Sequence, residues 1–253
     1  PTMRFSLGKV SYVTPLPLFC AGGFEGFEVF SEPPSSLNAR VARAEPAAAM
    51  ISRWVYEDGA DALYGVLPEY GIFGDGEIMS VKIFSKVPFE DFPKTSIFIT
   101  SETGTSSRAF AFLFKKKYGA DIFSMPRATL ESADAALLIG DEALAFPPRE
   151  FCADLGEMWR EEVGLPMMYS VFAVRRDVEG EVAPMLREGI EKSLAAFEAD
   201  PGAVVDSALR VLERAGRRCS RAVLEKYYSR LKYSLPPETF KKAFDFVAAH
   251  AGA

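Results

Sequence analysis

The sequence contains few of the side chains from which metal sites and catalytic triads are built. Its 253 residues include one histidine, His250, near the carboxyl end, and three cysteines, Cys20, Cys152 and Cys219, with no C-x-x-C pair. The single histidine argues against a histidine-based triad or metal site. The scattered cysteines indicate neither a zinc site nor a disulfide framework, and we interpret them as inert thiols in a reducing compartment.

Charge and hydropathy exclude further classes of partner. The net charge is −6 and the pI is near 5.1, which argues against nucleic acid as the main partner. No stretch approaches the roughly 18 apolar residues of a membrane span. No positively charged segment followed by an apolar stretch precedes the first expected strand. We therefore expect a soluble, cytoplasmic protein with a small-molecule ligand, of a size that suits one large domain or two modest lobes.

The chain is rich in apolar residues, 49% of the total, and they follow two alternating patterns. Short apolar runs predict strands at residues 4–7, 80–86, 95–100, 135–139 and 169–175. Helical spacing predicts helices at residues 36–43, 105–118 and 154–162. This alternation predicts an α/β protein with mostly parallel sheets.

Beyond residue 176 the pattern predicts helices only. An apolar face recurs at helical spacing from Val182 to Phe197, and Asp200-Pro201-Gly202 ends that helix. Three more helices are expected at 204–212, 220–231 and 237–247. The basic residues between 210 and 232 are interpreted as a solvated helix face.

Two lobes are expected, with the chain crossing between them at residues 86–92 and 169–176. Residues 1–92 and 171–253 would then form the first lobe, and residues 93–170 would be inserted as the second. Two α/β lobes leave a cleft between them, where ligands bind at strand ends and helix N-termini.

A cluster of small hydroxyl side chains marks one such junction. The stretch SETGTSSRAF (101–110) stands between the expected strand at 95–100 and the expected helix at 105–118. Free N–H groups and the positive end of the helix dipole gather at a helix start. Gly104 permits close backbone approach, and Thr105 and Ser106 add hydroxyl donors, so we interpret the junction as an anion site suited to a carboxylate. Ordinary helix capping is the alternative, and a P-loop is excluded because its Gly-Lys-Ser/Thr ending is missing.

Several segments together resemble one family. ADAALLIGDEAL (133–144), DLGEMWREEVGLPMMYSVFAVRR (154–176) and GDGEIMSVKIFSK (74–86) look like the chorismate dehydratase family of the futalosine route to menaquinone. VSYVTPLPL (10–18), PSSLN (34–38) and ETGTSS (102–107) resemble its remaining motifs. The resemblance covers nearly the whole chain.

The resemblance implies a fold and an activity. The fold would be a two-lobed, type II periplasmic-binding-protein-like α/β fold with a central cleft and a helical C-terminal segment. The activity would convert chorismate to 3-[(1-carboxyvinyl)oxy]benzoate by loss of water. Aromatisation of the ring supplies much of the driving force, so the family's reaction implies no metal and no cofactor.

The resemblance also implies roles for individual residues. Thr14 and Ser80 are the catalytic candidates. The substrate-binding candidates are Ser36, Ser52, Arg53, Gly104, Thr105, Ser106 and Asp141. Ser36 and Asp141 can equally be read as helix caps, and Ser80 as an ordinary strand serine.

Three positions depart from the family's pattern. Thr14 stands where members carry Asn in Tyr-x-Asn, and a hydroxyl reaches less far than an amide. Ala47 replaces a common Asp. Arg53 stands where a second small hydroxyl residue is usual, and it could hold a carboxylate with two hydrogen bonds or pair at the surface. These changes suggest an altered substrate or an altered role.

Three functional hypotheses follow. The first is a lyase that acts on chorismate. The second is a non-catalytic, cytoplasmic binding protein for a small carboxylate. The third is a related enzyme for a different enolpyruvyl or cyclic acid. Turnover separates the first from the second, and ligand identity separates the first from the third.

Overall fold

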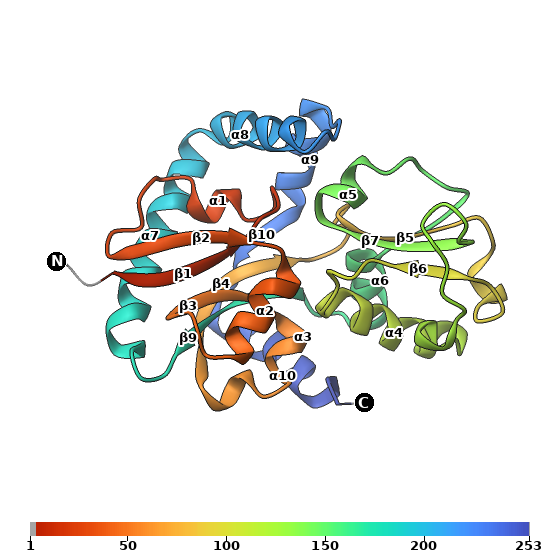
Figure 1. Ribbon diagram of the computed structural model, residues 1–253, viewed down its shortest axis with the longest axis horizontal. Coiled ribbons are helices and arrows are strands. Elements are labelled where there is room, and N and C mark those ends of the chain that lie inside the picture. The colour runs from red at the N-terminus through yellow and green to blue at the C-terminus, as the bar shows by residue number, and fades with distance from the viewer. Residues whose placement is uncertain (1–3, 253) are drawn as a thin grey trace.

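The chain forms two lobes, and each lobe is built around one β-sheet. The computed structural model describes residues 4–252, and Figure 1 shows the larger lobe beside the smaller one. The large sheet has the strand order β10-β4-β9-β3-β1-β2. In that order the strands are β10 (Leu231–Ser234), β4 (Tyr64–Gly74), β9 (Met167–Arg175), β3 (Ala48–Ser52), β1 (Phe5–Val10) and β2 (Phe27–Glu32).

The small sheet has the strand order β6-β7-β5-β8. Its strands are β6 (Ile97–Ile99), β7 (Ala135–Ile139), β5 (Val81–Ser85) and β8 (Phe151–Asp154). The α/β fold class is confirmed, but the expectation of mostly parallel sheets is wrong. Parallel pairing joins β1 to β2 and β3, and β6 to β7, whereas β4, β5, β8, β9 and β10 pair antiparallel.

Strand β5 corrects the expected lobe boundary. It pairs with β7 and β8 and therefore belongs to the small lobe, although it precedes the predicted crossing at 86–92. The chain instead crosses at residues 75–80, between β4 and β5, and returns at residues 163–166, before β9. Residues 169–176 are not a crossing, because β9 lies in the middle of the large sheet.

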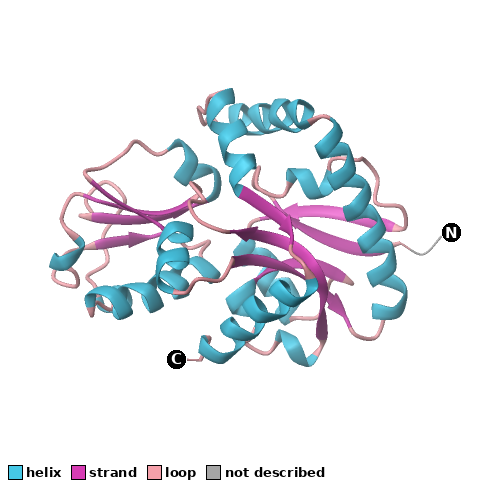
Figure 2. Ribbon diagram, turned by 180° about the vertical axis from the view of Figure 1, so that it is seen from behind, coloured by secondary structure: helices cyan, strands magenta, loops and turns pink. Residues whose placement is uncertain are grey.

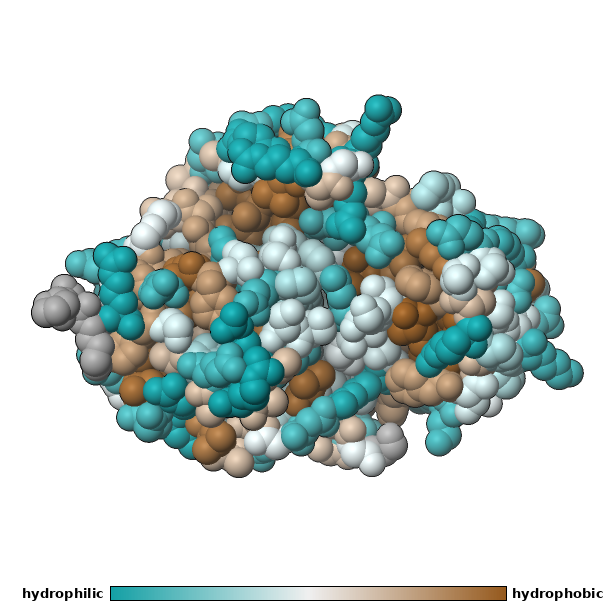
Figure 3. All heavy atoms as spheres, viewed as in Figure 1, coloured by the Kyte–Doolittle hydropathy of each residue, from teal (hydrophilic) through white to brown (hydrophobic). Residues whose placement is uncertain are grey.

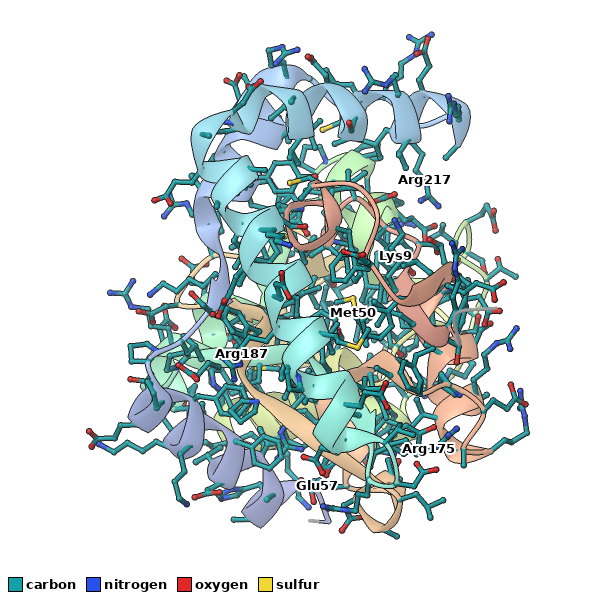
Figure 4. All side chains as sticks on the ribbon, turned by 90° about the vertical axis from the view of Figure 1, so that its left-hand side faces the viewer. Lys9, Met50, Glu57, Arg175, Arg187 and Arg217 are labelled. Carbon is teal, nitrogen blue, oxygen red and sulfur yellow. The ribbon has the colours of Figure 1, made fainter. Side chains whose placement is uncertain are left out.

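Helices cover both faces of the large sheet, which explains why β3 is buried along its whole length. Ala48 and Met50 face α7 (Glu179–Ala199), whereas Ala49 and Ile51 face the opposite core. Figure 4 shows Met50 beneath α7, and Figure 2 shows α7 along one side of the lobe. Side chains alternate across a strand, so a strand covered on both faces reads as one apolar run.

The remaining helices of the large lobe are short near the amino end and long near the carboxyl end. They are α1 (Leu16–Phe19), α2 (Pro34–Ala42), α3 (Arg53–Tyr56), η1 (Ala60–Ala62), α8 (Pro201–Arg214), α9 (Arg221–Arg230) and α10 (Pro237–His250). The expectation of helices only beyond residue 176 is wrong at one place, because β10 follows α9 and pairs with β4. None of the helices within residues 4–252 is long and apolar enough to span a membrane.

The small lobe carries its helices around the four-stranded sheet. They are η2 (Phe89–Asp91), α4 (Thr105–Tyr118), η3 (Ile122–Ser124), α5 (Gly140–Ala145) and α6 (Leu155–Glu162). The predicted helix at 105–118 and the predicted strand at 135–139 are confirmed to the residue.

The Asp154 carboxylate fixes the first crossing against the small lobe. Its oxygens accept the N–H of Ile78 at 2.9 Å and of Met79 at 2.8 Å. The same carboxylate caps α6 through Gly156 N–H at 2.9 Å and Glu157 N–H at 3.2 Å. Met79 has a φ of 70°, a left-handed conformation that a non-glycine residue adopts only when its surroundings impose it. These hydrogen bonds to Asp154 fix the backbone that leads into the following residue, Ser80.

We expect Asp154→Ala to lower the free energy of unfolding by roughly 2–4 kcal/mol, because it leaves several buried N–H groups without an acceptor. Asp121→Ala is the matched control, since Asp121 caps the exposed η3; it should cost about 1 kcal/mol or less. Urea unfolding of both variants is the measurement. An equal effect of the two substitutions would contradict the special role of Asp154.

Candidate active site

Both lobes contribute walls to one cavity at the seam between them. Its polar wall includes Thr14, Ser52, Ser80, Glu102, Thr105 and Ser106. Its apolar wall includes Val10, Ile72, Ile78, Val81, Ile139 and Leu231. In Figure 3, pale side chains of intermediate hydropathy follow the seam between the lobes. A mostly apolar cavity with a few convergent polar groups is typical of a small-molecule site.

The segment from Tyr12 to Thr14, between β1 and α1, is held on several sides. The Asp141 side chain at the start of α5 accepts the Val13 N–H at 3.1 Å. Tyr228 OH donates to the Val13 carbonyl at 2.7 Å, and Tyr233 OH donates to the Thr14 carbonyl at 2.6 Å. Both polar backbone groups of Val13 and the carbonyl of Thr14 are therefore paired, although these two residues are buried.

Tyr227 links the two residues predicted to be catalytic. Its hydroxyl lies 2.6 Å from Thr14 Oγ1 and donates to Ser80 Oγ at 2.9 Å. All three side chains are buried. Burial raises the pKa of the Tyr227 phenol, so its hydroxyl stays protonated at neutral pH. The sequence did not single out Tyr227, which lies on α9 among charged residues.

The N-terminus of α4 opens onto the cavity without a side-chain cap. The first N–H groups of a helix have no acceptor within it. Ser106 is buried in the cavity wall beside them. The helix start that the sequence predicted as an anion site thus faces the cavity and presents N–H groups to it.

Thr105 and Ser52 are occupied by protein contacts, those of Thr105 across the seam and those of Ser52 within the large lobe. Thr105 Oγ1 accepts the Trp54 N–H and donates to the Tyr169 carbonyl, both at 3.1 Å. Asn38 contacts Ser52 twice, through Ser52 Oγ and Ser52 N–H, both at 3.1 Å. Thr105 therefore joins the lobes, and its hydroxyl proton is not free for a ligand.

The sequence matches one family model over residues 5–250, and that model is described as menaquinone biosynthesis. The chain belongs to this family. A chorismate dehydratase of Thermus thermophilus is 27% identical over 194 residues, which span 68% of this chain and 70% of that relative.

Solved structures support the fold of this member of the menaquinone biosynthesis family. Protein AF1704 of Archaeoglobus fulgidus superimposes with a TM-score of 0.76 at 19% identity, covering 98% of this chain and 97% of the other. The periplasmic aliphatic sulphonate binding protein SsuA of Escherichia coli gives a TM-score of 0.66 at 9% identity, over 98% and 86% of the two chains. The predicted periplasmic-binding-protein-like fold is thereby confirmed.

Three of the predicted substrate-binding residues do not line the cavity. The guanidinium of Arg53 is turned toward α10, where it donates to the Phe244 carbonyl at 2.7 Å and lies 3.7 Å from the Phe244 ring centre. Its ion pair is with Glu57, at 2.7 Å. Asp141 is committed to Val13 N–H, and Ser36 is half-buried beside the cavity residue Pro34. The prediction that Arg53 holds a ligand is therefore wrong in this geometry.

Glu102 and Tyr12 face each other across the seam, and neither was a predicted site residue. The Tyr12 hydroxyl donates to the Glu102 carboxylate. Burial raises the pKa of Glu102, the nearby Glu142 adds to this, and the positive charge of Arg217 opposes it. Figure 4 shows Arg217 projecting from the loop after α8. The segment quoted for the family, ETGTSS, contains this glutamate and was the signal that could have identified it.

Gly104 of the small lobe lies close against the large lobe. A Cβ at this position would lie 2.7 Å from Val55 Cγ2 and 3.0 Å from Ser52 Oγ. An alanine would therefore force the two lobes apart without disturbing the core of either.

We expect Gly104→Ala to open the seam and to speed amide exchange at Trp54, whose N–H is donated across it to Thr105, by about tenfold. Gly180→Ala is the control, because nothing lies within 4 Å of a Cβ at Gly180. Hydrogen exchange read by mass spectrometry is the measurement. An unchanged rate at Trp54 in Gly104→Ala would show that the seam tolerates the methyl group.

We expect Asp141→Asn to stabilise the fold increasingly as pH rises. Burial raises the folded-state pKa of Asp141 above its ordinary value of 3.8, so the folded protein binds the proton more tightly than the unfolded chain does. The wild type therefore loses stability as pH rises from 3.8 through the folded pKa. Asparagine stays neutral and can still accept the Val13 N–H. Between pH 4 and 8, the melting temperature of Asp141→Asn should exceed that of the wild type by an amount that grows with pH. A difference independent of pH would contradict the raised pKa of Asp141.

Proposed function

We propose that this protein is a chorismate dehydratase-like lyase of menaquinone biosynthesis, which forms 3-[(1-carboxyvinyl)oxy]benzoate by loss of water. The observation that carries the proposal is the pair of buried hydroxyls, Thr14 and Ser80, joined through Tyr227 inside the cavity of a chain of this family. The likeness to the Thermus thermophilus chorismate dehydratase supports the choice of substrate.

Binding would use the uncapped start of α4 and the apolar wall. Free N–H groups and the Ser106 hydroxyl suit one substrate carboxylate. The apolar side chains around them suit the ring and exclude water. Gly104 has no side chain, so Val55 and Ser52 of the large lobe can pack against the start of α4 beside the cavity.

The reaction breaks two bonds on neighbouring ring carbons. The C–H bond breaks, its electron pair becomes a ring double bond, the C–O bond breaks, and the hydroxyl takes up a proton and leaves as water. Negative charge develops on the departing oxygen, where hydrogen-bond donors stabilise it most. We assign that contact to Ser80, which lines the cavity together with Thr14.

Two kinds of group can accept the ring proton. Glu102 is the carboxylate that lines the cavity within residues 4–252, and burial raises its pKa, which makes it a stronger base than an exposed glutamate. A carboxylate of the substrate itself is the other. The Glu102 carboxylate already accepts a hydrogen bond from Tyr12 OH. To act as the base, Glu102 must accept the ring proton while it keeps or gives up that hydrogen bond.

Incubation with chorismate, followed by mass spectrometry for loss of one water, tests the proposal. We expect turnover by the wild type, retained turnover in Thr14→Asn, and a loss of about 10²–10³ in kcat for Ser80→Ala. Ser124→Ala, at the exposed η3, is the control and should behave as the wild type.

Other outcomes separate the rival functions. If no variant turns over chorismate but chorismate raises the melting temperature, the protein is a carboxylate-binding protein of this fold. Turnover only in Thr14→Asn indicates that the native substrate differs from chorismate. Glu102→Gln then identifies the base: loss of turnover with retained binding assigns it to Glu102, and retained turnover assigns it to the substrate.

A further inference from the structure

The hydroxyl of Tyr227 has one proton and two hydrogen-bond partners. It lies 2.6 Å from Thr14 Oγ1 and 2.9 Å from Ser80 Oγ, and its side chain is fully buried. Each hydrogen bond uses one proton, so the phenol can donate to only one of these partners and must accept from the other. The chain of three hydroxyls can therefore run in one of two directions.

The heavy-atom geometry of the contact with Ser80 favours one of them. Tyr227 is the donor in its contact with Ser80, whereas either oxygen can donate in its contact with Thr14. With its proton directed to Ser80, Tyr227 must accept the proton of Thr14. The chain then runs from Thr14 through Tyr227 to Ser80.

Two groups with opposite hydrogen-bonding character remain for the cavity. Ser80 Oγ already accepts from Tyr227 and keeps its own proton to donate. Thr14 Oγ1 donates a hydrogen bond to Tyr227, so its lone pairs remain available to accept a hydrogen bond from a ligand. Both residues line the cavity. The bonds of 2.6 and 2.9 Å to the shared phenol place the two oxygens no more than 5.5 Å apart, so one ligand oxygen can reach both.

We propose that Tyr227 is a positioning residue that makes Ser80 a donor and Thr14 an acceptor toward a single hydroxyl of the substrate. This inference rests on the proposed function and names the group concerned, the hydroxyl that departs as water. That hydroxyl donates its proton to Thr14 and accepts from Ser80. As the C–O bond breaks, charge builds on the oxygen and the contact from Ser80 strengthens, supported by Tyr227 behind it.

The same direction explains why threonine can occupy this position. An asparagine would donate an amide N–H to Tyr227 and present its carbonyl oxygen to the cavity. Thr14 presents the same pattern, with a donor toward Tyr227 and an acceptor toward the ligand. An ionised aspartate only accepts hydrogen bonds, so at this position it would take the proton of Tyr227 and reverse the direction of the hydrogen bonds.

The inference also predicts a specificity. A ligand that carries an ammonium group in place of the hydroxyl, as in 4-amino-4-deoxychorismate, donates but cannot accept. Its ammonium group and the Ser80 hydroxyl would then both be donors, and no hydrogen bond could form between them. A site built to hydrogen-bond a hydroxyl in both directions rejects such an analogue strongly, because a buried group is left unpaired.

Tyr227→Phe tests the proposal against Tyr64→Phe, which removes a buried tyrosine hydroxyl bonded to the Pro46 carbonyl, within the large lobe. We expect Tyr227→Phe to lower kcat on chorismate by about 10²-fold with KM within about threefold. The preference for chorismate over 4-amino-4-deoxychorismate, measured as a ratio of dissociation constants, should fall at least tenfold. Tyr64→Phe should leave kcat and the ratio unchanged. Thr14→Asn should keep the wild-type ratio, and Thr14→Asp should lose it.

The outcomes keep this inference separate from the proposed function. A Tyr227→Phe variant with wild-type kcat and an unchanged ratio would overturn the inference while leaving the lyase intact. A wild type that binds chorismate without turning it over would refute the proposed activity, and the ratio of dissociation constants would still decide the hydrogen-bond direction. Absence of both binding and turnover in the wild type overturns both. Thermal melts of Tyr227→Phe and Tyr64→Phe exclude a loss that arises from unfolding.

Discussion

The cleft depends on how the segment between β1 and α1 is held. The carbonyls of Val13 and Thr14 accept tyrosine hydroxyls, and the Val13 N–H is donated to Asp141. A buried backbone group left unpaired costs roughly 1–3 kcal/mol, so once this segment is buried each partner is required. The partners come from α5, α9 and β10. Amino-terminal and carboxyl-terminal parts of the chain and the small lobe therefore meet at Val13 and Thr14, and Thr14 lines the cavity.

The carboxyl-terminal segment forms part of the site as well as part of the large lobe. One side of α9 carries ion pairs, among them Lys226 with Glu77 at 3.3 Å, which agrees with the interpretation of its basic residues as a solvated face. The other side carries Tyr227 and Tyr228, whose rings stack 5.6 Å apart. Since Glu77 lies in the crossing at residues 75–80, α9 links the large lobe, the crossing and the segment that contains Thr14.

The spacing of apolar residues predicted individual helices and strands. It could not predict which strands pair or which distant side chains meet. The helix at 105–118 and the strand at 135–139 were predicted to the residue because each has one continuous period. Strand β4 was missed because Pro68, and Glu69 with a φ of 74°, interrupt it, and its pairing with β9 shifts register nearby. Tyr227 was missed because its contact with Thr14 joins residues 213 positions apart. Arg53 was assigned to the ligand because nothing in the four residues of α3 shows which way its side chain turns.

The proposed reaction leaves the two carboxylates of its substrate in place, and this limits which contacts can accelerate it. A carboxylate bound at the start of α4 is bound equally in substrate and product, so that contact contributes affinity and orientation but little to kcat. The hydroxyl is the group whose charge and bonding change. The buried charge of Arg53 is matched by Glu57 and covered by Phe244, outside the cavity. Stabilisation of the departing oxygen would therefore come from the neutral groups around it, whichever group accepts the ring proton, and their effect depends on which of them donates. A protein that fixes this direction through one buried phenol stabilises the departing oxygen without a charged side chain that would bind the product as tightly as the substrate.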